Sequence, residues 1–299
     1  MNLIKLAACI TSTSLLIACG GGGGGSSSAP IGNSSTPAID MAKAQQVINT
    51  NADIALATYT DSVVTAEALK TALATFKSNP TKINLTAAKK AWLVAREPYG
   101  QTEVYRFRQS PVDTLDVEGD INAWPLGEAL IDYVKINNSD FGDNQVGVTA
   151  NDVVINGGGA VTAEYANNNP TDNIIGNSSI VIDNDLLDRS LSAEDEHDVI
   201  SGYHAIEFLL WGQDLNTTDQ STTDGTDRDQ AVNMTEAGGQ RPIEDFISQT
   251  AGDSADRRHQ YLEVVVDKLI SDLKKVQAQW AKNVEGNYRD TFTTINGET

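Results

Sequence analysis

The spacing of apolar residues predicts a chain built mainly from helices. Over 39–76 apolar side chains recur at three- and four-residue intervals, and the Ser-Asn-Pro sequence at 78–80 ends the pattern. A second helix is expected over about 84–107, with a kink or a restart just before Pro98 because proline removes a backbone donor. A short helix is expected over 126–134.

Two further helices are expected in the second half of the chain. One runs over 192–212, from a Ser192 start followed by acidic residues that favour the positive end of the helix dipole. The other runs over 254–286, with Ser254 as cap and Gly286 at the end. Its apolar positions alternate at three and four residues: Leu262, Val265, Leu269, Leu273, Val276 and Trp280. A helix of this length needs a long neighbour, so an elongated, left-handed helical bundle is the default architecture.

The stretch 136–185 has a different character, rich in Asn, Gly and Asp. Its short β-branched pieces at 153–155 and 180–182 allow at most one small hairpin within an irregular insert. The expected fold class is therefore all-α, an elongated helical bundle with an irregular Asn/Gly-rich insert.

The N-terminus is typical of an exported protein. A basic Lys5 precedes an apolar run too short to span a membrane, which predicts a secretory signal. The end of this run, Leu-Ile-Ala-Cys at 16–19, resembles the lipobox of bacterial lipoproteins, in which Cys19 carries the lipid; an ordinary signal peptide is the alternative. The expected organisation is a lipoprotein signal at 1–19, a flexible Gly/Ser tether at 20–37 and a helical domain at 38–299.

Charge and cysteine usage exclude several functions. The chain has 41 acidic and 21 basic side chains and a net charge of −20, which repels nucleic acid. Cys9 would leave with the signal and Cys19 would carry lipid, so the mature chain has no thiol for a disulfide, a metal site or a nucleophile.

The stretch 202–214 holds the most informative polar residues. His204 and Glu207 are three residues apart and project from one face of an otherwise apolar helix, which we expect to be buried. A buried carboxylate requires a partner: a cation, an arginine or a metal. From the pattern alone, the two residues are either a ligand pair or a hydrogen-bonded pair in the core.

One face of the second helix also carries alternating aromatic and charged residues. They are Trp92, Arg96, Tyr99, Glu103 and Arg106, at steps of four, three, four and three residues. This pattern fits either a salt-bridged solvent face or the wall of a polar cleft, and the interleaved aromatic rings favour the cleft.

Standard hydrolytic sites do not match the sequence. The His-Glu-x-x-His motif is absent, and the inverted form fails because residue 208 is phenylalanine. A single histidine with carboxylates is an oxygen-rich donor set, which suits iron or manganese better than zinc.

The 202–214 stretch resembles the Gly-x-His-x-x-Glu signature of the imelysin family, which includes iron-regulated lipoproteins of bacterial envelopes and proteins described as insulin-cleaving membrane proteases. Three further stretches agree in order: 91–107, 122–126 and 238–246. The resemblance covers about 39–290 and implies an all-helical bundle, an envelope location and a metal site.

The resemblance also implies roles for individual residues. His204 and Glu207 are the expected metal-binding pair, with Glu103 as a further ligand. The residues expected to line the cleft are Arg96, Tyr99, Arg106, Trp124, Trp211 and Asp214. Chains of this family normally continue with a second helical half, whereas this sequence stops at Thr299 after a Tyr-Arg-Asp-Thr-Phe stretch.

Three hypotheses follow for function. The first is a lipid-anchored envelope protein at the outer membrane, facing the periplasm or the surface. It would bind a divalent metal ion, iron foremost, in metal uptake or handling. Its partners would include other iron-uptake proteins of the envelope. The second is a metal-dependent peptidase of the imelysin type. The third is a non-catalytic helical ligand-binding module in which His204 and Glu207 form only a hydrogen bond.

Overall fold

The computed structural model describes residues 39–122, 126–132, 173–191, 199–212 and 241–294. From Met41 onward these residues belong to one compact unit. Its elements in chain order are α1 (Met41–Ser78), α2 (Lys82–Gln101), the 3-10 helix η1 (Thr102–Tyr105), α3 (Pro111–Thr114), α4 (Glu118–Asn122), α5 (Glu128–Ile131), α7 (Asn184–Leu191), α8 (Gly202–Trp211), the 3-10 helix η4 (Ile243–Phe246), α9 (Ser254–Gln279) and α10 (Tyr288–Thr293). The described residues contain helices and no strand, which confirms the all-α fold class.

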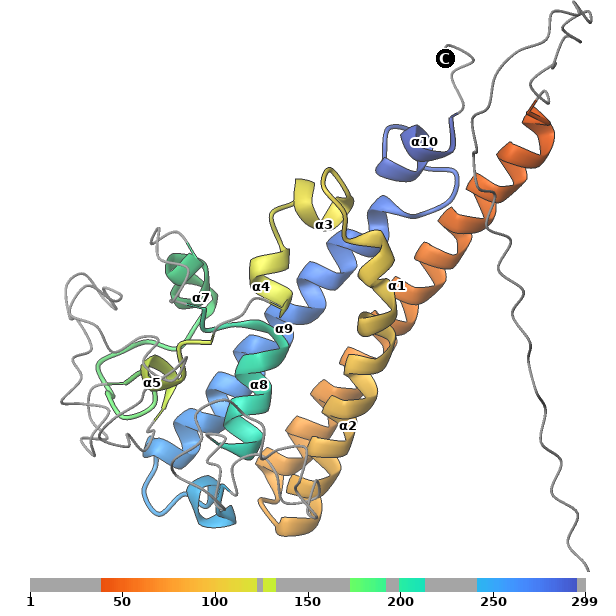
Figure 1. Ribbon diagram of the computed structural model, residues 1–299. Helices are drawn as coiled ribbons and strands as arrows, with labels where there is room; N and C mark the ends of the chain where they lie inside the picture. Colours follow the sequence, from red (N-terminus) through yellow and green to blue (C-terminus); the bar gives the residue numbers. More distant parts are fainter. Residues whose placement is uncertain (1–38, 123–125, 133–172, 192–198, 213–240, 295–299) are drawn as a thin grey trace, which may run out of the picture. The chain divides into compact units, whose positions relative to one another are not determined.

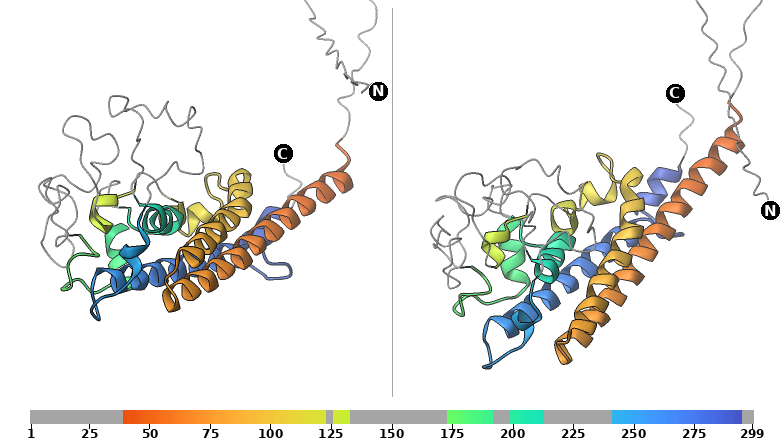
Figure 2. Two further views of the ribbon diagram at one scale, coloured as in Figure 1. Left: turned by 90° about the horizontal axis from the view of Figure 1, so that it is seen from below. Right: turned by 60° about the horizontal axis from the view of Figure 1, so that its bottom comes forward.

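The three longest helices, α1, α2 and α9, form the main packing unit. They lie side by side in all the views (Figures 1 and 2), and α8 lies against α2 and α9. The α1–α2 turn is closed by Thr81, whose Oγ1 accepts a hydrogen bond of 3.3 Å from the backbone N–H of Asn84. The hairpin therefore begins its second helix two residues before the sequence analysis expected.

Helix α9 confirms the apolar pattern read from the sequence. All six positions of that pattern are buried: Leu262, Val265, Leu269, Leu273, Val276 and Trp280. Its cap is Asp253, whose Oδ1 accepts from the N–H groups of Ala255 at 3.0 Å and Asp256 at 3.1 Å. The expected end at Gly286 is wrong, because the helix stops at Gln279 and the chain then turns through Asn283, which has a φ of 59°.

Helix α1 buries only part of its apolar pattern. The buried members of that pattern are Val63, Leu69, Leu73 and Phe76. Val47, Ile54 and Val64 are exposed, whereas Ala52 and Ala55 are fully buried. Small side chains in the interface allow neighbouring helices to approach closely, so size as well as hydrophobicity selects the inner face.

The proline in α2 does not restart the helix. The helix continues through Pro98 to Gln101 and then tightens into the 3-10 helix η1 at Thr102. Proline deprives the carbonyl of residue 94 of its helical donor, and Val94 is half exposed, so water can bond to that carbonyl.

The region 173–191 contains more helix than expected. Helix α7 occupies 184–191, so it overlaps only the last two residues of the expected insert, and Ile180–Ile182 are not in a strand. The expected piece at 153–155 lies outside the described residues.

The expected helix over 192–212 does not include 199–201, which are not helical, and 192–198 lie outside the described residues. Val199 forms an isolated parallel bridge with Leu126 instead. Helix α8 starts only at Gly202, where the backbone has a φ of +78° that interrupts any preceding helix.

Backbone hydrogen bonds join the chain on either side of two long stretches that lie outside the description. Trp211 and Arg241 flank 213–240, and the Arg241 N–H donates to the Trp211 carbonyl at 2.9 Å. On either side of 133–172, the N–H groups of Ile174 and Ile175 donate to the carbonyls of Leu130 at 2.8 Å and Ile131 at 3.0 Å. In both places the chain returns to the position from which it left.

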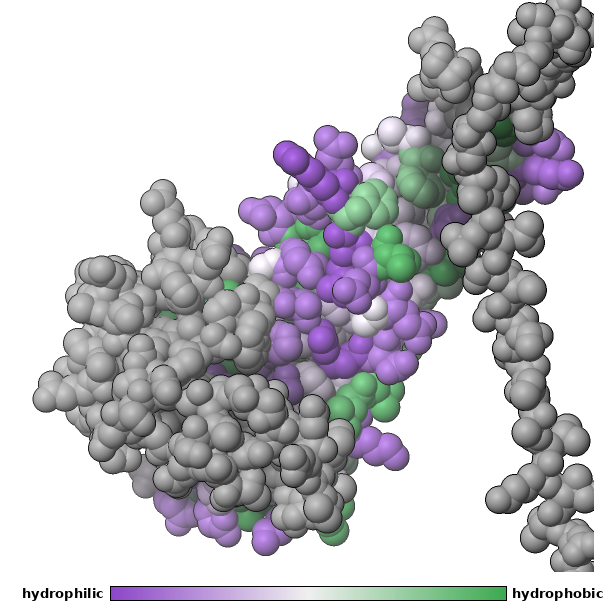
Figure 3. Space-filling model, viewed as in Figure 1, coloured by the Kyte–Doolittle hydropathy of each residue, from purple (hydrophilic) through white to green (hydrophobic). Residues whose placement is uncertain are grey.

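The surface is mixed in polarity. In the view of Figure 3 the coloured surface is mostly hydrophilic, with separate hydrophobic groups between the polar ones. Among the described helices, none combines the length and the apolar character needed to span a bilayer.

Candidate functional site

The glycine of the Gly-x-His-x-x-Glu sequence has a structural explanation. Gly202 opens α8 with a φ of +78°, a region that other residues rarely adopt. A Cβ atom at this position would lie 2.4 Å from the carbonyl oxygen of Ile121 and 2.6 Å from that of Asp120. The absence of a side chain therefore lets the start of α8 pack directly on the end of α4, two residues before His204.

His204 and Glu207 form a pair on one face of α8, as their spacing predicted. His204 Nδ1 lies 3.1 Å from Glu207 Oε2. The expectation that this face is buried is wrong: the side chain of His204 is 20% exposed and that of Glu207 is 42% exposed. Solvent can therefore hydrate the carboxylate, so it does not need a buried counter-ion.

Helix α2 packs antiparallel to α8 and fixes it by hydrogen bonds to backbone. Trp92 Nε1–H donates to the Tyr203 carbonyl at 2.8 Å, and the Tyr203 hydroxyl donates to the Ala95 carbonyl at 3.2 Å. The Trp92 ring also packs edge-on against Trp211, with centroids 5.4 Å apart. These contacts hold the His204–Glu207 face beside the polar edge of α2.

Two cationic side chains of α2, Lys89 and Arg96, lie over aromatic rings of α8. The Nζ atom of Lys89 lies 5.1 Å from the centre of the Trp211 ring, and the guanidinium carbon of Arg96 lies 5.1 Å from that of Tyr203. Glu207 is one turn from each of these aromatic residues on the same stripe of α8. We call Lys89, Trp92, Arg96, His204, Glu207 and Trp211 together the α2–α8 rim.

Arg96 is also held from α4. It donates through Nη1 to the side-chain oxygen of Asn122, the last residue of α4. The α2–α8 rim is therefore supported by a third helix, α4, through Asn122, which no local spacing in the sequence pointed to.

Tyr99 and Arg106, expected to line a cleft, both bond instead to Glu118 of α4, whose side chain is partly exposed. The Tyr99 hydroxyl donates to Glu118 Oε2 at 3.0 Å, and Arg106 Nη1 donates to Glu118 Oε1 at 3.0 Å. Burial raises the pKa of Tyr99, and the adjacent Glu118 charge adds to the effect. Tyr99 is fully buried, so it does not face an open cleft.

Glu103 does not join His204 and Glu207. It is exposed on η1, seven residues after Arg96, which itself lies over Tyr203 at the start of the antiparallel α8, so Glu103 lies beyond the start of α8. Within the described ranges no three His, Cys, Asp or Glu side chains are grouped so that they could hold a metal ion. Trp124, Asp214 and Cys19 lie outside the described residues.

A buried cluster of ionic side chains, which the sequence did not predict, links α9 to the residues next to two undescribed stretches. Asp132 directly precedes 133–172, and Arg241 directly follows 213–240. Asp132 accepts hydrogen bonds from Arg241 Nη1 at 2.7 Å, Arg258 Nε at 2.6 Å and Arg258 Nη2 at 3.0 Å. The side chains of Asp132 and Arg241 are each only 1% exposed. Three residues from separate regions meet here, so no local spacing could reveal the cluster.

A second buried cluster surrounds Lys268. Its Nζ lies 2.9 Å from carboxylate oxygens of both Asp120 and Asp188 and 3.4 Å from Asp272. The hydrogen bonds and charges of these carboxylates raise the pKa of Lys268 despite its burial. The cluster joins α4, α7 and α9 beneath the start of α8.

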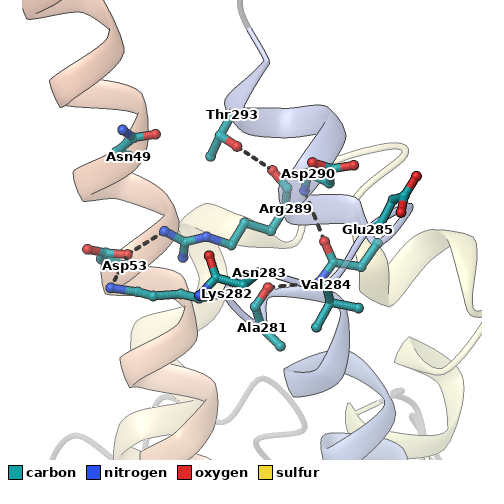
Figure 4. Close-up of a pocket in the computed structure, with 11 residues that line it drawn as sticks. Asn49, Asp53, Ala281, Lys282, Asn283, Val284, Glu285, Arg289, Asp290 and Thr293 are labelled. Atoms are coloured by element: carbon teal, nitrogen blue, oxygen red, sulfur yellow. Dashed lines mark hydrogen bonds and ion pairs between the residues drawn. The ribbon is translucent and has the colours of Figure 1, made fainter.

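A polar cavity of about 580 Å³ lies away from the rim, between α1 and the end of α9 with α10. Figure 4 shows that Asp53 of α1 receives both Lys282 and Arg289 in this cavity. Both cations contact the same oxygen of Asp53, and none of the residues predicted for the metal site lines the cavity.

Comparison with known proteins places this geometry in context. The chain matches the family model of imelysin over residues 55–299. It is 36% identical over 73 residues to iron-regulated protein A from Synechococcus elongatus, a match covering 24% of this chain and 20% of that protein. A crystal structure from Parabacteroides distasonis, named for an iron-regulated protein A precursor, is similar with 18% identity and a TM-score of 0.49, covering 87% of this chain and 52% of that one. The chain thus spans about half the length of that structure and a fifth of the length of the curated relative.

Proposed function

The chain belongs to the imelysin family, and we propose that it binds iron as cargo through His204 and Glu207, in iron uptake or handling at the bacterial envelope. The observation that carries the proposal is the paired imidazole and carboxylate on the exposed face of α8. The two donor atoms are 3.1 Å apart, and metal bonds to such atoms are about 2.0–2.2 Å long, so one ion can contact both.

The donor types favour iron or manganese. Imidazole nitrogen and carboxylate oxygen suit these ions, and the only two cysteines of the chain lie at positions 9 and 19. The name of the relative from Synechococcus, iron-regulated protein A, supports iron among these ions.

Two protein donors leave most of the coordination sphere of an ion to other ligands. Glu207 is accessible to solvent, so water or a ligand brought with the ion can complete the sphere. An incomplete set of protein donors fits an ion that is collected and passed on better than a permanent structural ion, whose protein ligands typically close the site.

Peptidase activity has less support from these residues. A metallopeptidase needs an ion held firmly by protein ligands and a separate base to activate water. In the part of the chain that the structure describes, the rim offers one histidine and one carboxylate. Metal-dependent cleavage of a peptide library that is lost in Glu207→Ala would favour the peptidase instead.

We further propose that the protein is a lipoprotein attached through Cys19, at the outer membrane. The support is the short apolar run ending in Leu-Ile-Ala-Cys and the Gly/Ser-rich stretch that follows it. Its partners would then be the metal ion, the membrane through the lipid alone, and other iron-uptake proteins of the envelope.

Metal-dependent stabilisation of the full chain, purified in detergent, tests the site. At a free ion concentration 100 times Kd, binding adds about 2.7 kcal/mol, which raises Tm by roughly 5–10 °C for a unit of this size. We expect this rise with iron or manganese and its loss in the double variant His204→Ala, Glu207→Ala.

A matched control uses Glu103, the third expected ligand, which is exposed on η1. Glu103→Ala should keep the full rise in Tm. Equal stabilisation of the wild type and the His204/Glu207 double variant would show that the ion binds elsewhere and would refute the proposal.

A further inference from the structure

Among the described residues, two half-buried cations of the rim lack a carboxylate partner. Other buried cations are neutralised or bonded: Arg258 and Lys268 contact aspartates, and Arg257 donates to three backbone carbonyls. Lys89 and Arg96 are half-buried, and among the described residues neither has an acidic side chain within ion-pair distance. Within the described ranges, a protein with a net charge of −20 thus has two cations at the candidate site without a carboxylate partner.

The bonding of Arg96 leaves most of its donors available. Its guanidinium is positioned over the rings of Trp92, Tyr99 and Tyr203, at 5.8, 5.9 and 5.1 Å, and it donates to Asn122. In the part of the chain that the structure describes, its other N–H groups have no acceptor. A guanidinium fixed in this way is preorganised to bind a carboxylate with two parallel hydrogen bonds.

The charged form of Lys89 is disfavoured by its surroundings when no ligand is bound. Burial lowers the pKa of its ammonium group, and the nearby charge of Arg241 lowers it further. An anion placed near Lys89 would relieve both effects, because it would compensate the charge that burial and Arg241 oppose.

The positions of the two cations matter for any metal at His204 and Glu207. Lys89 lies over Trp211 and Arg96 over Tyr203, the residues one turn after and one turn before Glu207. Counted over the six rim residues that the structure describes, two cations and one carboxylate give a net positive charge. A bare divalent or trivalent ion would be repelled by that charge, whereas a metal complex with negative charge would be attracted.

We propose that the rim binds its metal as a complex with an anionic polycarboxylate chelator. The ion contacts His204 and Glu207, the chelator supplies the remaining oxygen ligands, and its free carboxylates bind Arg96 and Lys89. This inference rests on the proposed function, since it takes the same two protein donors as given.

Isothermal titration of the full chain with three probes tests this inference: ferric citrate prepared with excess citrate, ferrous ion alone without oxygen, and citrate alone. We expect ferric citrate to bind the wild type at least tenfold more tightly than either of the other probes. Ferrous binding with no binding of ferric citrate would overturn the inference and leave the proposed function standing. Absence of binding by any form of iron would overturn the proposed function itself.

Two double variants of α2 separate local recognition from overall charge. Lys89→Gln with Arg96→Gln removes the rim cations, and Lys82→Gln with Lys90→Gln removes two exposed cations of the same helix. At about tenfold for each charge-assisted contact, the rim variant should weaken ferric citrate binding about 100-fold. It should leave ferrous binding unchanged or stronger, and the control should bind both as the wild type does.

An equal loss in both double variants would show a general charge effect and overturn the inference, as would an equal loss of ferric citrate and ferrous ion in the rim variant. Arg96→Lys guards against misfolding of that variant, because it keeps the charge over the rings. It should show an intermediate loss, since the ammonium cannot form the two parallel bonds.

Discussion

Replacement of Gly202 by alanine tests how the His204–Glu207 pair is positioned. Two costs are expected from the structure. A side chain at a φ of +78° costs about 1–2 kcal/mol, and the new Cβ would lie 2.4 Å from the Ile121 carbonyl oxygen. An ordinary contact begins near 3.4 Å, so α8 and α4 must separate by about 1 Å, and such overpacking typically costs about 1–3 kcal/mol.

The expected loss for Gly202→Ala is therefore about 2–5 kcal/mol, measured as the free energy of unfolding in urea. Gly286→Ala is the matched control: its φ is +76° and nothing lies within 4 Å of the added Cβ. The control should lose only the conformational term of about 1–2 kcal/mol. Equal losses in the two variants would refute the idea that close contact with α4 requires this glycine.

Three further predictions concern other parts of the chain. Asp132→Asn should reduce the free energy of unfolding by about 3–5 kcal/mol, since it removes the shared carboxylate of two buried arginines; a loss below about 1 kcal/mol in urea would contradict this. Burial lowers the pKa of His259 below its ordinary value of 6.5, so stability should be constant above pH 6.5 and fall as pH drops below it. His259→Gln should flatten that fall, and an unchanged pH profile would assign it to other groups. Cys19→Ala should abolish incorporation of radiolabelled fatty acid, and persistent labelling would exclude this cysteine as the anchor.

The sequence predicted the long helices well because their burial is encoded locally. Six periodic apolar positions identified the inner face of α9. The same method was only partly right for α1. Most of its apolar positions from Val63 onward are buried, but Val47, Ile54 and Val64 face outward, and the buried alanines carry too weak an apolar signal to be recognised.

Only the part of the candidate site that lies within one helical turn was predicted from the sequence. The spacing of His204 and Glu207 predicts their contact, since residues three apart share a face. Spacing within one helix could not place Glu103 relative to α8, because it does not give the register of the two antiparallel helices, which leaves Glu103 beyond the start of α8. Glu118 and Asp132 were missed because their partners lie far from them in sequence or on other elements.

The backbone hydrogen bonds between Trp211 and Arg241 and between Leu130 and Ile174, on either side of the two long undescribed stretches, have a practical consequence. Each exit and return are joined by a backbone hydrogen bond, so the helices do not depend on the number of residues between them. Closing a loop of twice the length costs only about 0.6 kcal/mol more. Both positions are thus suitable sites for inserting peptides, reporter domains or purification tags without changing the packing of the helices.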